Sequence, residues 1–120
     1  DPWQPSKLYY NHTFHKERLV ALHTMMTEHD IESPYAEWLA NWVDKPEDEG
    51  RLTTRVECAE FFHLRDAALI AHATQVDPNG RWFTCPLPLQ QQAWPTEDFQ
   101  LARTHVKSDL PEADLFAGLR

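Results

Sequence analysis

The sequence predicts a mostly helical chain with one or two short strands. Three segments repeat apolar residues at spacings of three and four, which is the pattern of a helix with one buried face: residues 14–28, 33–42 and 58–76. Residues that favour strands gather only in two short stretches, residues 7–10 and 53–56. Helices therefore account for most of the predicted structure.

The longest predicted helix lies in the segment from Cys58 to Phe83. Its apolar stripe consists of Phe61, Phe62, Leu64, Ala68, Leu69 and Val76. His72 falls on this stripe, and Arg65 and Gln75 flank it, so polar groups are expected on the buried side. The helix must end by Asp77, because Pro78 disfavours helical geometry in the residue before it. This pattern predicts a pocket wall; the alternative is a histidine that is hydrogen-bonded inside a core.

The first strand and the first helix follow one another. Lys7 to Tyr10 are rich in β-forming residues and predict a strand. The helix predicted over residues 14–28 places Leu19, Leu22 and Met26 on one face. Its N-cap is expected at Asn11 or Thr13, whose side-chain oxygens can accept a backbone hydrogen bond.

The second helix has a clear start. Ser33 is a suitable N-cap, and Pro34 follows at the first helical position, where its missing N–H has no cost. The stripe on this helix is strongly aromatic and consists of Tyr35, Trp38, Leu39 and Trp42. So large a stripe predicts burial against another surface.

The C-terminal half predicts shorter elements. Thr53 to Val56 predict a short strand or an extended lead-in to the longest helix. Residues 87–94 predict a short helix closed by a proline. Thr96, followed by Glu97 and Asp98, predicts another capped helix start, since acidic residues suit a helix N-terminus. The tail, residues 113–120, is apolar enough to pack onto the rest of the chain.

Composition narrows the classes of partner. With 120 residues the chain has the length of one ordinary domain, and its 11 basic and 19 acidic residues give a net charge of -8. This balance argues against nucleic acid or an anionic membrane as partner. No apolar run approaches the roughly 20 residues of a membrane span. Cys58 and Cys85 are expected to be free thiols in a reducing cytoplasm.

The residues alone predict an incomplete catalytic site. His12 and His15 are three residues apart, but no closely spaced set of zinc ligands is present. The sequence also has no glycine-rich phosphate loop, no nucleophile elbow and no Cys-x-x-Cys pair. We therefore predict no metal ligand and no catalytic residue from these patterns.

Six segments together carry a family resemblance. In the order of the chain they are KLYY, SPYAEWLANW, LTTRVECAEFF, RDAALIAHATQVDPNG, PLPLQQQAWPTEDFQLAR and DLFAGL. They resemble the C-terminal part of mycothiol S-conjugate amidases, which belong to the LmbE/PIG-L deacetylase family of zinc hydrolases. The resemblance spans nearly the whole chain.

This resemblance implies a fold, a reaction and a location. The implied fold is Rossmann-like α/β, of which residues 1–120 form a single C-terminal domain or half-domain. In the complete cytoplasmic enzyme, zinc activates a water that attacks the amide between an N-acylcysteine conjugate and glucosaminyl-inositol. The family's metal and general-base motifs lie in an N-terminal half that is absent from this sequence. No zinc is therefore expected to bind to this chain alone, which is predicted to be inactive.

The resemblance also implies pocket residues. His72 and Gln75 of AHATQ are expected to face the substrate pocket, with Tyr10 and His12 at the strand end as further candidates. Trp94 and the stripe of the second helix are expected to meet the missing sheet.

Three hypotheses follow for the function. The first is the substrate-pocket and scaffold part of such an amidase, whose partners are the N-terminal half or a companion subunit and the mycothiol S-conjugate. The second is a non-catalytic helical interaction module derived from that scaffold. The third is self-association through the strand edge and the aromatic stripe.

Overall fold

The computed structural model describes residues 2–120 and divides them into two compact units. The strand unit consists of residues 2–13, 44–57 and 96–120, and the helical unit consists of residues 14–43 and 58–95. Each unit is thus built from segments that are distant in the sequence. We describe each unit by itself.

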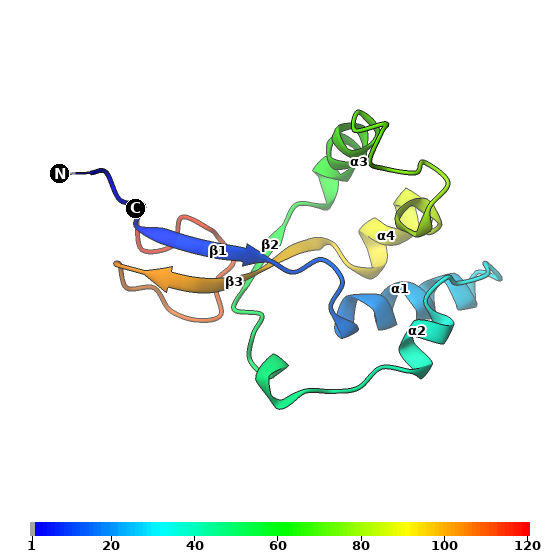
Figure 1. The fold of residues 1–120 in the computed structure, drawn as a ribbon, viewed down its shortest axis with the longest axis horizontal. Coiled ribbons are helices and arrows are strands. Elements are labelled where there is room, and N and C mark those ends of the chain that lie inside the picture. Colours follow the sequence, from blue (N-terminus) through cyan, green and yellow to red (C-terminus); the bar gives the residue numbers. More distant parts are fainter. Residues whose placement is uncertain (1) are drawn as a thin grey trace. The chain divides into compact units, whose positions relative to one another are not determined.

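The strand unit contains a three-stranded antiparallel sheet with the order β1-β3-β2. β1 spans Lys7–Asn11, β2 spans Thr54–Glu57 and β3 spans Thr96–Thr104 (Figure 1). The pairing places β3 between the other two strands. The strands predicted over residues 7–10 and 53–56 are confirmed. A small sheet accompanied by helices is compatible with part of an α/β domain.

The third strand corrects the prediction of a helix that starts at Thr96. The Thr96 hydroxyl donates to Asp98 Oδ1 at 2.6 Å, two residues further along the extended chain, instead of capping a helix. β3 is bonded to a strand on each side, and these long-range pairings decide its conformation. The sheet consequently has three strands, where one or two short ones were expected.

The helical unit contains four α-helices. They are α1 (Lys16–Glu28), α2 (Ala36–Ala40), α3 (Phe62–Ile70) and α4 (Leu87–Ala93). None of the helices in the described part of the chain is long and apolar enough to cross a membrane. The buried core of this unit consists of Leu19, Leu22, Met26, Tyr35 and Cys85.

The predicted face of α1 is confirmed, because Leu19, Leu22 and Met26 are all buried. The N-cap, however, is His15 and not Asn11 or Thr13. Its Nδ1 accepts from the backbone N–H of Arg18 at 3.3 Å. The helix therefore begins two residues later than predicted.

α2 begins two residues later than predicted, at Ala36 with Tyr35 as its N-cap instead of Ser33, and its aromatic stripe is only partly buried. Ser33 Oγ accepts from the Tyr35 N–H at 3.2 Å, and Tyr35 enters the core. Trp38 stays partly exposed and packs against Trp42, with 6.4 Å between the ring centroids. In the same unit, Trp94 lies against His15.

α3 is shorter than predicted, and its apolar stripe is not buried along its length. The helix ends at Ile70, and His72 lies beyond it with an exposed side chain. The His72 Nδ1 lies 2.8 Å from the Ala68 carbonyl oxygen, where its N–H satisfies one of the carbonyls left without a partner at the helix end. Phe62 is buried, whereas Leu64 is exposed. The prediction of a histidine on a buried face was therefore wrong.

Replacing Leu22 by alanine is expected to lower the free energy of unfolding by roughly 2 to 5 kcal/mol, because the side chain is 1% exposed and its removal leaves a cavity. Val20 on the same helix is 42% exposed, so Val20→Ala is the matched control and should change stability much less. Urea unfolding followed by tryptophan fluorescence measures both. An equal decrease in the free energy of unfolding in the two variants would contradict the assignment of Leu22 to the core.

Candidate functional site

One face of the sheet gathers polar side chains from all three strands. Residues directly opposite each other in an antiparallel pair share a face. The register places Tyr10 opposite Gln100 and Arg55 opposite Asp98. Because side chains alternate along a strand, Gln100 and Asp98 also share this face. We call this set, together with His12, the polar face.

Tyr10 lies near the C-terminal end of β1, and His12 directly follows its last residue. Tyr10 is 54% exposed, so its phenol is available to a ligand. The backbone N–H of His12 donates to the Asp98 carbonyl at 2.9 Å, and its Nε2 lies 2.9 Å from Gln100 Oε1. The structure thus brings two of the four predicted pocket residues together and fixes the second of them to β3.

Asp98 and Gln100 are residues of the polar face that the sequence analysis missed. Asp98 is 1% exposed, although it was interpreted as an acid at a helix N-terminus. A signal was present: Asp98 and Gln100 alternate with Phe99 and Leu101, which is the alternation of a strand. The adjacent acids at 97 and 98 concealed it.

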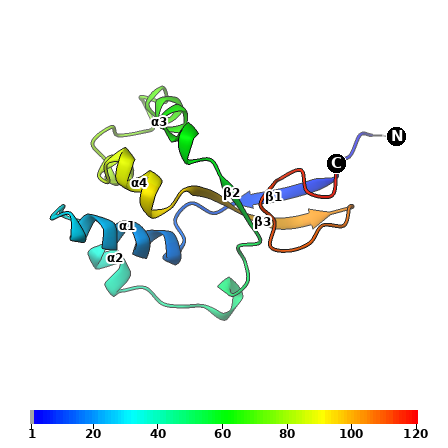
Figure 2. The ribbon, with the colours of Figure 1, turned by 180° about the vertical axis from the view of Figure 1, so that it is seen from behind.

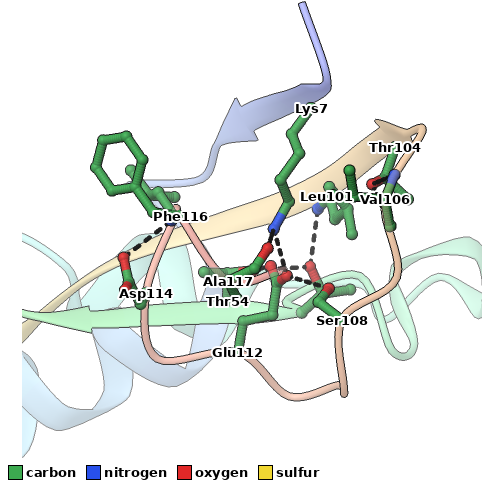
Figure 3. Close-up of polar contacts among 12 residues, drawn as sticks. Lys7, Thr54, Leu101, Thr104, Val106, Ser108, Glu112, Asp114, Phe116 and Ala117 are labelled. Carbon is green, nitrogen blue, oxygen red and sulfur yellow. Dashed lines mark hydrogen bonds and ion pairs between the residues drawn. The ribbon is translucent and has the colours of Figure 1, made fainter. Parts of the chain in front are cut away.

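The opposite face of the sheet carries a buried carboxylate, Glu112, which is 4% exposed (Figure 3). Its Oε1 accepts from the Tyr9 and Thr54 hydroxyls, each at 2.6 Å. Its Oε2 accepts from Lys7 Nζ at 2.6 Å and from the Ser108 hydroxyl. Lys7 and Tyr9 alternate with Leu8 and Tyr10, so this network holds β1 from the side opposite Tyr10.

The C-terminal segment brings this carboxylate to the sheet. The Glu112 N–H donates to the Thr53 carbonyl at 2.8 Å, and the Arg55 N–H donates to the Glu112 carbonyl at 3.0 Å, so the segment continues the pairing beyond β2. Lys7 Nζ also donates to the Ala117 carbonyl at 2.7 Å. The segment folds back beside β1 (Figure 2), so the expectation that the tail packs onto the chain is confirmed within this unit.

The hydrogen bonds of the network set its charges. Burial alone raises the pKa of Glu112, but the bonds from Lys7, Ser108, Thr54 and Tyr9 outweigh it and lower this pKa from 4.5 to about 2. Burial alone lowers the pKa of Lys7, yet the bond to Glu112 leaves it raised. Glu112 and Lys7 are therefore an ion pair at neutral pH.

His72 and Gln75 belong to the helical unit and occupy one exposed turn after α3. The Gln75 N–H donates to the His72 carbonyl at 2.8 Å, which places the two residues side by side. Both side chains are exposed. Their predicted contact with a substrate stays a prediction.

The described residues show no cluster of potential metal ligands. Within residues 2–120, no three His, Cys, Asp or Glu side chains come together in a way that could hold a metal ion. In the strand unit His12 approaches Gln100, and in the helical unit His15 caps α1.

The chain is similar to one segment of larger enzymes. It is 51% identical over 118 residues to the mycothiol S-conjugate amidase of Streptomyces coelicolor. This alignment covers 98% of this chain and 40% of that protein. The 1D-myo-inositol 2-acetamido-2-deoxy-alpha-D-glucopyranoside deacetylase of Streptomyces avermitilis is 39% identical over 72 residues, 60% of this chain and 24% of that protein.

A second deacetylase relative covers more of the chain. Deacetylase 2 of Frankia alni, which bears the same enzyme name, is 29% identical over 125 residues, 99% of this chain and 43% of that protein. No family model matches the chain, and no solved structure matches it. The chain thus spans less than half the length of these relatives.

Replacing Glu112 by glutamine is expected to lower the free energy of unfolding by roughly 3 kcal/mol at pH 7, because it removes the carboxylate whose pKa is held at about 2. The folded pKa lies below the unfolded value of 4.5, so this stabilisation is complete above about pH 4.5 and is lost as the pH falls to about 2. Urea unfolding of both proteins across this pH range is the measurement.

Asp114→Asn serves as the control for that substitution. Asp114 pairs with Arg120 at 3.3 Å, and both side chains are well exposed. Loss of this ion pair should lower the free energy of unfolding by less than about 1 kcal/mol. A difference between the wild type and Glu112→Gln that does not shrink at low pH would contradict an ionised Glu112.

Proposed function

Because the chain is homologous to mycothiol S-conjugate amidase along nearly its whole length, we propose that it is the C-terminal, substrate-pocket part of an amidase of this family. Its substrate is then a mycothiol S-conjugate, cleaved at the amide between the N-acylcysteine conjugate and glucosaminyl-inositol. The expected cytoplasmic location stays a prediction. The similarity over 98% of this chain to one segment of the Streptomyces coelicolor amidase supports a contribution of this segment to the reaction.

The polar face is the observation that carries this proposal. An amide bound to a sugar and an inositol offers hydroxyl, N–H and carbonyl groups, which are recognised by neutral donors and acceptors held in fixed positions. Tyr10 supplies a phenol and His12 an imidazole, two residues apart at the end of one strand. The family resemblance implies both as pocket residues, and we propose that they hydrogen-bond the substrate.

His72 and Gln75 are proposed as a second group of substrate contacts. An exposed amide and an exposed imidazole in one turn suit a polar ligand, and neither side chain is required by the core of the helical unit.

Zinc chemistry has to come from elsewhere in this proposal. Residues 2–120 do not gather a set of metal ligands. The zinc of the complete amidase is then held by residues outside these 120 positions, on an N-terminal half or a companion subunit. The chain by itself should hydrolyse nothing.

A helical interaction module without catalytic function is the second candidate. Exposed apolar side chains favour it, because Trp38 and Val43 in the helical unit remain accessible beside the partly buried Trp42. Apolar groups gathered at a surface are typical of a site that binds another protein.

Complementation separates the two functions. The part of the Streptomyces coelicolor amidase that does not align with this chain is produced separately and mixed with it, and hydrolysis of a mycothiol S-conjugate is measured. Activity that needs both proteins supports the amidase role. A stable complex with no hydrolysis, in the presence of added zinc, would favour the interaction module instead.

In the complemented enzyme, Tyr10→Phe and His12→Asn should each lower kcat/KM at least about tenfold, because each removes a hydrogen bond to the substrate. His63→Asn is the matched control, since His63 is exposed on α3 and outside the polar face. An unchanged kcat/KM in both Tyr10→Phe and His12→Asn would contradict the proposal that the polar face binds the substrate.

A further inference from the structure

We propose that Gln100 is a positioning residue that fixes the proton of His12 on Nε2 and so leaves Nδ1 as the nitrogen that meets a ligand. The link to a substrate rests on the proposed function. The position of the proton is a property of this chain alone and can be tested without any activity.

Two adjacent anchor points on β3 hold His12. Its backbone N–H donates to the Asp98 carbonyl at 2.9 Å, and its ring Nε2 lies 2.9 Å from Oε1 of Gln100, two residues further along. Both anchors lie on the central strand of the sheet. The backbone and the ring of His12 are thus oriented by the same strand.

The orientation of the Gln100 amide, with Oε1 toward the imidazole, leads to the proposed position of the proton. A side-chain carbonyl oxygen carries no hydrogen and only accepts, so a hydrogen bond between it and Nε2 requires the hydrogen to be on Nε2. A neutral imidazole carries one hydrogen, so the lone pair is then on Nδ1. Gln100 therefore determines which nitrogen accepts and which donates.

The location of Gln100 suits this role. It is partly buried on the central strand, and it lies directly opposite Tyr10 in the register. One side chain is consequently adjacent to both proposed substrate contacts. A ligand on the polar face would meet a phenol beside an acceptor nitrogen, an arrangement that suits a ligand O–H or N–H donor such as a sugar hydroxyl.

The test is the ¹⁵N NMR spectrum of the histidine side chains in the intact chain, recorded at a pH at which the imidazoles are neutral. The protonated and unprotonated ring nitrogens have distinct shifts, so the spectrum reports the tautomer of each ring. Wild-type His12 is expected to show a protonated Nε2 and an unprotonated Nδ1. His12→Asn identifies its signals.

Three variants of Gln100 decide whether this residue sets the tautomer. Gln100→Leu removes the acceptor, so the His12 signals should shift toward a mixture of tautomers. Gln100→Glu offers only acceptor oxygens, so its His12 signals should match those of the wild type. If Gln100 only stabilised the fold, this recovery would not be expected. Gln100→Lys offers only donors and should move the proton to Nδ1. Gln92→Leu, at an exposed position of α4, is the control and should leave the His12 signals unchanged.

Two results would overturn the proposal: a wild-type His12 protonated on Nδ1, or a His12 spectrum that is unchanged in Gln100→Leu. In the complemented amidase, Gln100→Glu should retain several-fold more kcat than Gln100→Leu. A complemented enzyme without activity, beside the expected tautomer shifts, would refute the proposed function and leave the positioning role intact.

Discussion

The buried carboxylate of Glu112 is the interaction on which the strand unit depends. It joins β1 through Lys7 and Tyr9, β2 through Thr54 and the C-terminal segment through Ser108. A charge removed from water is costly unless it is paired and hydrogen-bonded, and here both carboxylate oxygens accept two bonds each. The same bonds that lower the pKa of Glu112 therefore fix three distant segments of the chain to one another.

Because side chains alternate along a β-strand, the bonds to Glu112 on one face of β1 also determine which side chains of β1 lie on the polar face. Lys7 and Tyr9 point toward Glu112, so Tyr10 points to the other face, where it lies opposite Gln100. His12 follows at the strand end and is tied to β3 by its backbone and its ring. One face of β1 thus provides the anchor, and the other presents the groups that we assign to the substrate.

The sequence predicted the elements that depend on local patterns and missed those that depend on distant partners. The buried face of α1 and the strand over residues 7–10 follow from periodicity and composition, and both are confirmed. β3 was mistaken for a helix because Thr96 and its acidic neighbours also suit a helix cap, and only pairing on both sides shows it to be a strand. The role of Glu112 could not be predicted, because its partners lie up to 105 residues away in the sequence. Tyr10 and His12 were predicted as pocket residues only through the family resemblance, since no local rule distinguishes them from other polar residues, and this stays a prediction.

Hydrogen exchange of the backbone amides in Glu112→Gln tests most directly whether the buried carboxylate holds the strand that carries Tyr10 and His12. The amide of His12, which donates to the Asp98 carbonyl, should exchange markedly faster than in the wild type, together with the paired amides of β1. The amides of α1, whose core is formed within the helical unit, should be affected much less. Unchanged protection at His12, in a variant confirmed to lack the carboxylate, would contradict the central role of Glu112.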